Sequence, residues 1–354
     1  MSMSLLLTDL VSIYSPSGEE QAAVSALVAW MNAHGFGAHI DAAGSAVGER
    51  SDTRAEGTAP KTLMLLGHID TYPGHIPTRV EDDVLYGRGS VDAKGSLCAF
   101  AEACAEATIP AGWRVVVAGA VEEESATSKG ARQIAATYQP DLCIIGEPSG
   151  ASRITLGYKG RLLVDATLKR ANAHTARPEP SAVELAVDFW QAVKAWAKTE
   201  NEGITRYFDQ IMPSLRRVRS GDDPFIETVE MTLGFRLPPA WMPEAVLEAI
   251  TKLAPEGMEL HGYGPERAHQ SNRASPLVRN LAAAIRANGD DPGYVLKTGT
   301  SDMNVVGAVW DCPIVAYGPG DSNLDHTPDE HLPLAEYRRA VQVLRTLIEA
   351  LPPG

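Results

Sequence analysis

Residues 62–70 read TLMLLGHID, an apolar run that ends in a histidine and an aspartate. Two more apolar runs follow, WRVVVAGAV at 113–121 and DLCIIG at 141–146, with helical stretches after Gly95 and Lys129 between them. Apolar strands that alternate with helices predict an α/β fold with a largely parallel sheet buried between helices. Ligand sites in such folds gather beyond the carboxyl ends of the strands, so the polar residues after these runs are the first candidates for a functional site.

The amino-terminal part of the chain holds one predicted helix and one predicted loop. Ser17 followed by Glu20 has the spacing of a capping box, which predicts an amphipathic helix through about Met31. Residues 43–61, AGSAVGERSDTRAEGTAPK, have the composition of a long flexible loop.

The regular alternation of predicted strands and helices changes at residue 157. Strands RLLVDATLK and VEMTLGFRL and helices at about 182–198 and 243–253 predict a small α+β layer, after which helices and strands alternate again up to a terminal helix at 334–351. A chain of 354 residues exceeds what one hydrophobic core usually serves. We therefore expect a metal-binding catalytic domain formed by 1–156 and 266–354, with a smaller domain, 157–265, inserted into it.

Composition and charge exclude several classes of partner. With 44% hydrophobic residues and a formal net charge of −14, the chain is typical of a globular protein that nucleic acid and anionic membranes would repel. The start MSMSLLLTDL lacks a basic segment and Asp9 interrupts its apolar run, so we expect no signal peptide or membrane anchor and a cytoplasmic location. The four cysteines lie in apolar runs without CxxC spacing, which favours buried free thiols.

Short motifs rich in histidine and carboxylates follow the predicted strands. His68 and Asp70 lie two residues apart, so an extended backbone directs both side chains to the same side, where His68 can bind a metal and Asp70 can orient it. Asp92 lies in the glycine-rich turn GRGSVDAKG, and its two carboxylate oxygens can bridge two metal ions. Taken alone, the first motif is compatible with a capped strand end and the second with a tight turn before a helix.

The triplet Glu122, Glu123 and Glu124 is the sharpest local signal. Three adjacent carboxylates repel one another, and a solvated charge run rarely follows an apolar strand directly, so metal binding would explain them. One of these glutamates would bind metal beside a neighbour that acts as general base toward water. Glu147 in GEPS and His326 in LDHTPDE complete a mixed set of nitrogen and oxygen ligands of the kind that zinc prefers. Together these motifs predict a two-metal hydrolytic site.

The motifs resemble those of the zinc aminoacylase superfamily, which contains acetylornithine deacetylase, succinyl-diaminopimelate desuccinylase and glutamate-releasing carboxypeptidase. The resemblance covers nearly the whole chain and implies a zinc-peptidase-like catalytic domain with an inserted lid and dimerisation domain. It also implies two zinc ions per subunit, with cobalt or manganese as substitutes, and hydrolysis of a linear amide bond.

The resemblance assigns a role to each motif residue. One ion would be held by His68, Asp92 and Glu147, and the other by Asp92, Glu124 and His326, while Asp70 orients His68 and Glu123 is the general base. The family usually reads Asp-Glu-Glu at the triplet, and one extra residue precedes Gly130 here, so a shift to Glu122 as base and Glu123 as ligand stays open. Relatives also hold their bridging aspartate by an unusual peptide bond, so we expect a strained, cis Asp92–Ala93 bond.

The wording of four motifs narrows the expected substrate. GHIDTYPGHIP, LYGRGSVDAKG, EEESATSKGA and GEPSG are most similar to members of the superfamily that release lysine from a small acidic amino-group carrier protein in lysine biosynthesis, with carrier-bound ornithine as a second substrate. The scissile bond there is an amide between a carrier glutamate side chain and the lysine α-amino group. A deacylase or desuccinylase of free N-acyl amino acids is the alternative with the same chemistry. A metal-dead amino-acid-binding scaffold is the alternative of another class, and the full ligand set weighs against it.

The inserted domain is expected to supply specificity. Arg236 in GFRLPP is a candidate for bidentate binding of the substrate carboxylate, or else an arginine paired on a sheet surface. By the resemblance, His174 in NAHTARP reaches the active site of a partner subunit and donates to the oxyanion, which implies a homodimer through this domain. Weaker substrate-side candidates are Lys159, Arg161 and residues 297–302, and His331 is interpreted as structural.

The same domain is the expected docking surface for an acidic carrier. Residues 157–265 contain 13 Lys+Arg and 15 Asp+Glu, so they carry only −2 of the net charge of −14 and repel an acidic partner least. Arg216, Arg217 and Arg219 form the predicted docking patch, unless Asp222 and Asp223 pair with them. Further cationic residues of this domain are Arg161, Lys169, Arg170 and Arg177.

Overall fold

The computed structural model describes residues 6–52, 59–172 and 178–353, and the chain forms two compact units. The first unit comprises Met1–Gly157, Ser271–Leu296 and Ser301–Gly354, and the second comprises Tyr158–Gln270 and Lys297–Thr300. The short segment 297–300 thus clusters with the second unit, although the division expected from the sequence assigns it to the first domain. Each unit has its own hydrophobic core.

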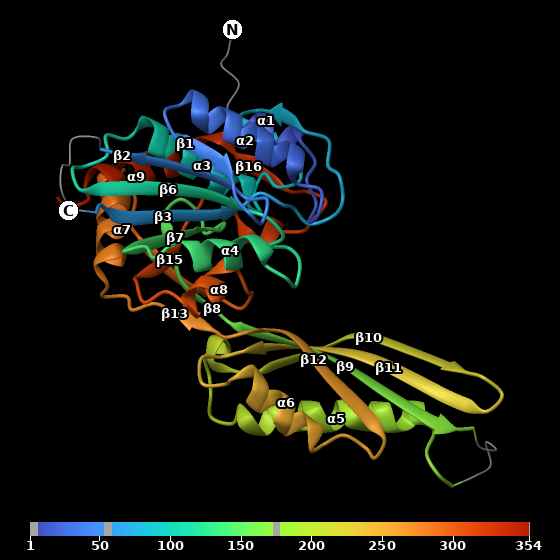
Figure 1. Ribbon diagram of the computed structural model, residues 1–354. Coiled ribbons are helices and arrows are strands. Elements are labelled where there is room, and N and C mark those ends of the chain that lie inside the picture. Colours follow the sequence, from blue (N-terminus) through green and yellow to red (C-terminus); the bar gives the residue numbers. More distant parts are fainter. Residues whose placement is uncertain (1–5, 53–58, 173–177, 354) are drawn as a thin grey trace. The chain divides into compact units, whose positions relative to one another are not determined.

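The first unit is built on a sheet of nine strands, all but β13 from this unit, which Figure 1 shows between layers of helices. Its centre runs in the order β6-β3-β7-β15, and these four strands are parallel to one another. The strands of this sheet are β1 (Gly37–Ile40), β2 (Ala46–Ser51), β3 (Lys61–His68), β6 (Trp113–Ala120), β7 (Leu142–Gly146), β8 (Arg153–Tyr158), β13 (His269–Gln270), β14 (Gly293–Lys297) and β15 (Ile314–Ala316). The predicted α/β class is confirmed, but the sheet is mixed, because β2 and β8 join the parallel centre in antiparallel pairs.

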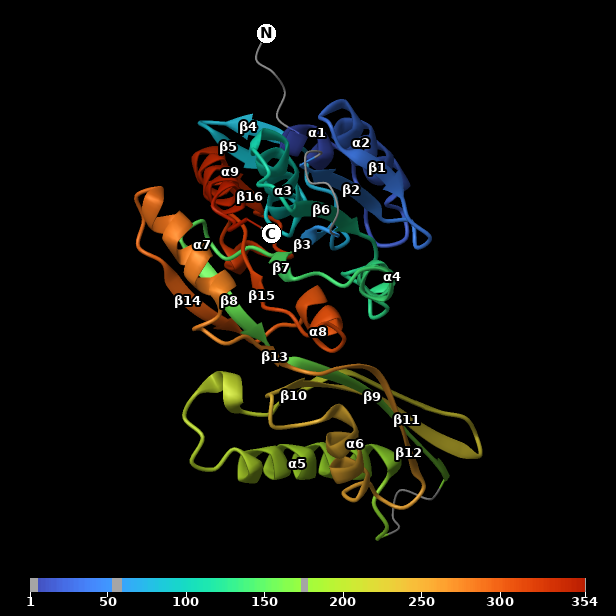
Figure 2. The same cartoon turned by 60° about the vertical axis from the view of Figure 1, so that its left-hand side comes forward.

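Helices cover both faces of this sheet (Figures 1 and 2). One face is packed by α1 (Leu6–Ser12), α2 (Gln21–Ala33), α3 (Lys94–Glu106), α7 (Pro276–Ala287) and α9 (Leu334–Glu349), and the other by α4 (Lys129–Thr137) and α8 (Asp302–Gly307). Helix α3 approaches the ends of β3 and β7 closely: a Cβ atom on Gly146 would lie 2.8 Å from the Phe100 ring and 3.1 Å from the Cα of Gly67. This close packing requires glycine where the strands end and brings α3 against the edge that carries the polar motifs.

A small three-stranded sheet fastens the carboxyl-terminal segment to this edge. It runs in the order β16-β5-β4, with β4 (Arg79–Glu81), β5 (Val84–Tyr86) and β16 (His331–Pro333). His331 pairs with Tyr86 and Pro333 with Val84, so residues just before β16 lie beside residues just after β5. The His326 motif and the Asp92 turn are thereby brought together from opposite ends of the chain.

The second unit is a four-stranded antiparallel sheet with two helices on one face (Figure 1). The strands run in the order β10-β11-β9-β12, and the elements are β9 (Gly160–Ala171), β10 (Met212–Asp222), β11 (Ile226–Leu237), β12 (Met258–Glu266), α5 (Ala182–Glu200) and α6 (Pro243–Thr251). A 3-10 turn, Tyr207–Asp209, precedes β10. Alternate residues of β9 and β11, such as Val164 and Leu233, pack with Phe189 of α5 and Ile250 of α6 in one core. A capping box of Ser181 and Glu184 begins α5.

Two local expectations for the amino-terminal region are wrong. Helix α2 begins after Glu20 without a side-chain cap, because the Ser17 hydroxyl and the Glu20 carboxylate bind other partners in the site described below. The predicted loop 43–61 contains the strand β2, which pairs with β6, while residues 53–58 lie outside the described part of the chain. The sequence also did not predict β10, a strand whose residues are mostly exposed.

The cysteines are as the sequence predicts. All four cysteines are free thiols; Cys98, Cys104 and Cys143 are buried and Cys312 is half-buried. No helix among the described residues is both long and apolar enough to cross a membrane.

Candidate metal centre

The candidate site lies where the central parallel strands of the first unit end. His68 is the last residue of β3, the glutamate triplet follows β6, and Glu147 follows β7. Because the strands are parallel, these carboxyl ends meet at one edge of the sheet. The Asp92 turn and the loop that carries His326 approach the same edge from elsewhere in the chain.

Asp92 connects the two histidines. Its Oδ1 lies 3.2 Å from His68 Nε2, and its Oδ2 lies 3.2 Å from His326 Nε2. His326 Nε2 also lies 3.0 Å from Glu124 Oε1. Asp92, Glu124 and His326 each offer one ligand atom, and these three atoms lie within 4.8 Å of one another. Two ligand atoms on one tetrahedral zinc ion lie roughly 3.4 Å apart, so the donor set fits a metal ion of this kind.

The electrostatics of both histidines also fit a cation. Burial lowers the pKa of His68, but hydrogen bonds to Asp70 and Asp92 outweigh burial and raise that pKa well above its ordinary value. Hydrogen bonds to Asp92 and Glu124 raise the pKa of His326 to about 10. The carboxylates thus favour a positive charge at each ring nitrogen, and a metal ion can take the place of the proton there.

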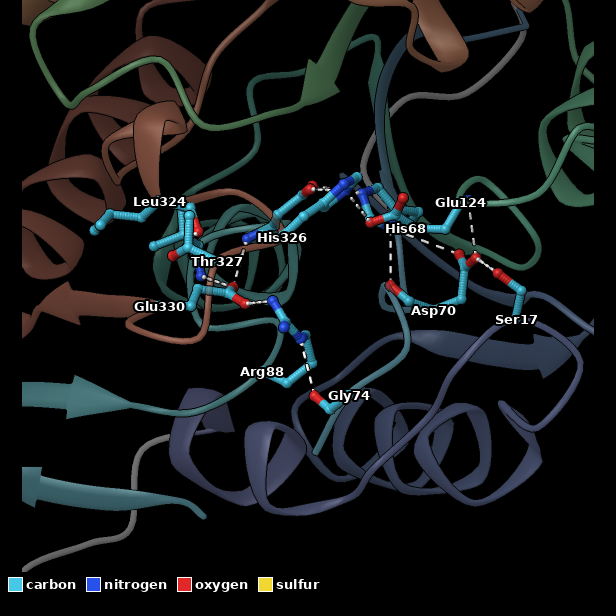
Figure 3. Close-up of polar contacts among 12 residues, drawn as sticks. Ser17, His68, Asp70, Gly74, Arg88, Glu124, Leu324, His326, Thr327 and Glu330 are labelled. Atoms are coloured by element: carbon cyan, nitrogen blue, oxygen red, sulfur yellow. Dashed lines mark hydrogen bonds and ion pairs between the residues drawn. The ribbon is translucent and has the colours of Figure 1, made fainter. Parts of the chain in front are cut away.

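Asp70 organises two neighbours of the site (Figure 3). The backbone oxygen of Asp70 lies 2.9 Å from His68 Nδ1, which orients the ring so that Nε2 faces Asp92. Its carboxylate is fully buried and accepts three hydrogen bonds: from the Glu123 amide at 3.1 Å, from the Glu124 amide at 3.0 Å and from Ser17 Oγ at 2.6 Å. Asp70 therefore holds both the histidine and the glutamate loop.

The three adjacent glutamates point to different environments. The Glu122 amide, at φ +60°, donates to Glu20 Oε1 at 3.2 Å. The Glu122 carboxylate accepts from Thr127 Oγ1 at 2.6 Å and lies 3.7 Å from Lys129 Nζ, away from the histidines. Glu124 faces His326, as described above. Of the three carboxylates, that of Glu123 contacts neither Lys129 nor His326 among the residues that the structure describes.

Burial raises the pKa of the Glu123 carboxyl well above its ordinary value, and the negative charges of Glu147, Asp302 and Glu124 raise it further, against a lowering effect of His68. Glu147 is itself buried at the end of β7, and its charge acts on Glu123, so it belongs to the same cluster of acidic side chains. Asp302 is a buried residue in the first turn of α8 that the sequence did not single out as an individual site residue.

The loop that carries His326 is a tight turn. Thr327 donates both its amide and its hydroxyl to Leu324 O, at 3.1 and 2.8 Å, and His326 has a φ of +61° (Figure 3). The imidazole stacks on Tyr72, with ring centroids 4.2 Å apart and planes 13° apart. The aromatic contact and the turn together fix the direction of the ring.

The turn that carries Asp92 shows the expected unusual peptide bond. The Asp92–Ala93 bond is cis, which confirms that prediction. Two buried charged residues that the sequence did not single out lie against this turn, Arg88 and Glu330. Both residues lie inside motifs that the sequence singled out, Glu330 in LDHTPDE and Arg88 in GRGS. Their charges within these motifs were the sequence feature that could have identified them. The ring of His331 in β16 lies beside the ring of Tyr86 in β5, with centroids 5.2 Å apart, in keeping with a structural role.

Two candidate residues of the second unit, Arg236 and Lys159, have hydrogen-bond partners within that unit. Arg236, near the end of β11, donates a hydrogen bond to Thr300 Oγ1. Lys159 is fully buried and donates to Tyr207 O at 3.1 Å and to Gln210 O, and burial lowers the pKa of its ammonium to about 8. His174 and Arg177 lie outside the described residues.

Comparisons with known proteins identify the class. Residues 64–350 match the model of Peptidase family M20/M25/M40, and the chain belongs to this family. Its fold and site are those of a metal-dependent hydrolase that cleaves amide bonds.

Relatives of known name lie within this class. The chain is 46% identical over 358 residues to the LysW-lysine hydrolase of Deinococcus radiodurans, covering 99% of this chain and 97% of the relative. It is 39% identical over 345 residues to the putative LysW-lysine/LysW-ornithine hydrolase of Thermococcus kodakarensis, covering 98% of this chain and 91% of the relative.

Solved structures share the fold. Aminopeptidase PepT from Bacillus cereus has a TM-score of 0.77 at 17% identity, covering 97% of this chain and 96% of that one. The Bacillus subtilis YXEP protein, described as a dinuclear metal binding peptidase of family M20, has a TM-score of 0.72 at 13% identity and covers 97% and 96%.

Proposed function

We propose that this protein releases lysine, and also ornithine, from an acidic amino-group carrier protein by metal-dependent hydrolysis of the amide bond that links them. One structural observation supports the chemistry above all others: the two oxygens of Asp92 each face a histidine ring nitrogen, at 3.2 Å in both cases. The identity of 46% to a LysW-lysine hydrolase supports the substrate, because the match extends over nearly the whole of both chains. A place in lysine biosynthesis, and in arginine biosynthesis through ornithine, follows from this proposal.

The proposed ligand sets share Asp92. His68, Asp92 and Glu147 would hold one ion, and Asp92, Glu124 and His326 the other. Histidine nitrogens with carboxylate oxygens suit zinc, and cobalt or manganese could replace it. When bound, the ions supply a Lewis acid for the scissile carbonyl oxygen and lower the pKa of water.

Glu123 is the proposed general base. Its carboxylate would accept a proton from the water that attacks the carbonyl carbon and then deliver that proton to the amide nitrogen, so that the C–N bond breaks. The water hydroxyl stays on the carrier glutamate as part of its carboxyl group, and lysine leaves with a free α-amino group. The environment of Glu122 supports this register over the alternative of Glu122 as base, because Thr127 and Lys129 already bind the Glu122 carboxylate. Asp70 would keep His68 and the Glu123–Glu124 loop in place during the reaction.

The second unit is the proposed source of specificity. Arg236 would bind the carboxylate of the lysine product, since a guanidinium matches a carboxylate in a bidentate pair. His174 would donate to the oxyanion in the active site of a partner subunit. A homodimer through this unit is supported by β10, an edge strand on which Leu215 and Val218 are 36% and 50% exposed.

A single comparison of substrates tests the proposal. The full-length protein is assayed for metal content and for turnover of carrier-linked lysine and of free N-acetyl-lysine, N-acetylornithine and N-succinyl-diaminopimelate. We expect bound metal and a kcat/KM for carrier-linked lysine that exceeds the other values by orders of magnitude. Preferred hydrolysis of a free acyl amino acid would assign the protein to the deacylase or desuccinylase alternative. Metal-free protein without turnover would assign it to the scaffold alternative.

A further inference from the structure

Glu330 is a buried carboxylate that the proposed reaction leaves without a role. It has no measurable exposure, and both of its oxygens are engaged. Oε1 accepts the backbone amides of Val91 at 2.9 Å and Asp92 at 3.1 Å, and Oε2 accepts Arg88 Nη1 at 2.8 Å. The Glu330 carboxylate therefore binds the backbone of Asp92, the residue whose two side-chain oxygens face the two histidines.

Arg88 binds both Glu330 and a third segment of the chain, at Gly74 (Figure 3). Its side chain is 7% exposed, and its Nε donates to Gly74 O at 3.0 Å. The guanidinium lies 5.9 Å from the centre of the Tyr72 ring, and Tyr72 stacks on His326. His326 therefore contacts Tyr72, which lies near Arg88. Arg88 binds Glu330, Glu330 binds the backbone of Asp92, and the side chain of Asp92 contacts His326.

Glu330 belongs to the same segment of the chain as His326. Glu330 lies four residues after His326, and its backbone oxygen accepts the Gly87 amide at 3.3 Å. The segment 326–330 therefore carries a candidate metal ligand, His326, at one end and Glu330, which binds the Asp92 turn, at the other. Any shift of this segment would move His326 and the backbone of Asp92 together.

From this geometry we propose that Glu330 and Arg88 are positioning residues of the metal centre, which hold the bridging carboxylate of Asp92 in place without binding metal themselves. The inference rests on the proposed function, because it requires Asp92 to bridge two ions. The physical reason is that a bridging carboxylate must keep both oxygens directed at two sites, and a small tilt of its backbone moves both. Groups that orient metal ligands typically change metal affinity or activity by about 10–100-fold when they are replaced.

A buried ion pair could also serve the fold alone. Burying an arginine and a glutamate together is weak evidence for stability, whereas removing one partner leaves an unpaired buried charge. The two roles differ in what a variant changes. A purely structural pair would alter the melting temperature alone, while a positioning pair would alter the affinity for metal as well.

The test compares two conservative variants with a matched control on full-length protein. Glu330→Gln keeps the size of the side chain but can no longer accept from both Arg88 and the two amides. Arg88→Lys keeps the charge but cannot reach both Glu330 and Gly74 O with a single ammonium. Glu102→Gln is the control, because Glu102 is also a largely buried carboxyl with a burial-raised pKa that accepts a backbone amide, from Leu6 at 3.2 Å, outside the candidate site.

The main readout is the zinc affinity of each metal-stripped protein, measured by competition with a chelator, next to the melting temperature without metal. We expect both Glu330→Gln and Arg88→Lys to bind zinc about 10–100-fold more weakly than wild type, and Glu102→Gln to bind as wild type does. Added zinc should restore much of the kcat of the two variants without changing that of wild type. Should Glu330→Gln fail to fold, the zinc affinity of Arg88→Lys decides.

Unchanged zinc affinity in the folded variants, with a lower melting temperature only, would overturn the inference and leave the pair a structural one. Equal weakening in Glu102→Gln would do the same, because the effect would then not be specific to Asp92. Wild-type protein that binds zinc but does not hydrolyse carrier-linked lysine would contradict the proposed substrate alone. Wild-type protein without any metal affinity would contradict the proposed function and this inference together.

Discussion

At the scale of the residue, neighbours in sequence have different environments. Glu122, Glu123 and Glu124 are adjacent, yet one contacts Lys129, one lies among buried carboxylates and one contacts His326. A left-handed backbone at Glu122 turns the chain after β6, and the Asp70 carboxylate then holds the two following amides. The separation of roles within the triplet follows from this loop geometry, and two predictions depend on it.

Replacing Glu123 by Gln should abolish turnover and leave the metal content unchanged. The amide has nearly the same size as the carboxyl but cannot accept the proton, and loss of a general base typically costs about 10²–10⁴-fold in rate. Glu124→Gln is the matched comparison and should lose metal, because the Glu124 carboxylate faces His326. Both variants are assayed for kcat and for bound metal by elemental analysis. Metal loss in Glu123→Gln and not in Glu124→Gln would move both roles one residue earlier.

Zinc binding to the metal-free protein should release protons. The facing carboxylates raise the pKa of His326 to about 10, so this ring carries a proton near pH 7.5 when no metal is bound, and hydrogen bonds to Asp70 and Asp92 raise the pKa of His68 well above its ordinary value. A raised pKa favours folding below the ordinary imidazole value of about 6.5, and this contribution disappears as the pH rises through the folded-state pKa. Apparent zinc affinity should increase as the pH rises towards about 10, because below that pH a proton competes with zinc for the His326 ring nitrogen.

Titration calorimetry in buffers of different ionisation enthalpy measures the number of protons released, which we expect to be on the order of two for wild type. His326→Ala should release about one proton fewer. Binding enthalpies that do not depend on the buffer would show that the rings are already neutral in the metal-free protein.

At the scale of the element, β10 carries the features expected of a docking surface. Arg216, Arg217 and Arg219 are all exposed on this strand. Asp223, one of the two residues that could neutralise them, uses Oδ1 to accept the amides of Phe225 and Ile226, both at 2.7 Å, in the turn that follows. An acidic carrier would meet three arginines here, with Glu230 opposite Arg219 on β11, on a chain whose net charge is −14.

Replacing Arg216 and Arg217 by Glu should weaken hydrolysis of carrier-linked lysine at low salt, mainly through a slower association rate. Hydrolysis of a small N-acyl-lysine should barely change. Lys194→Glu with Lys198→Glu, an equal change of charge on exposed residues of α5, is the control. Equal losses on both substrates, or no loss on either, would exclude these arginines as the docking surface. Light scattering on the same variant checks that its oligomeric state is unchanged.

At the scale of the whole molecule, the proposal requires two copies of the chain. An unpaired edge strand with exposed apolar side chains can pair with a second strand, and β10 ends the sheet of the second unit. We expect size-exclusion chromatography with light scattering to give a dimer for wild type and a monomer, or a concentration-dependent mixture, for Val218→Lys. Val309→Lys is the control, since Val309 is 58% exposed in the first unit and Val218 is 50% exposed. A monomeric wild type at micromolar concentration would contradict the proposed dimer.

The class of the fold and the inventory of polar groups at the site follow from local sequence. Short apolar runs such as 62–68 that alternate with helical stretches are typical of buried parallel strands, and the direction of the strands places the residues at their ends, His68 and Glu147 among them, at the carboxyl edge. These features depend on periodicity and on neighbours along the chain, which a sequence displays directly. Strand β10 escaped prediction because its side chains are mostly exposed, so it lacks the apolar alternation of a half-buried strand.

Tertiary structure alone decided which polar groups meet. The spacing of Ser17 and Glu20 is that of a helix cap, but Asp70 and the Glu122 amide, more than 50 residues away, compete successfully for the same oxygens. Arg88 and Glu330 are separated by 242 positions, and their pairing depends on the three-stranded sheet that brings β16 to β5. A local pattern cannot encode such contacts, because a buried polar group binds whichever partner the folded chain brings within hydrogen-bonding distance.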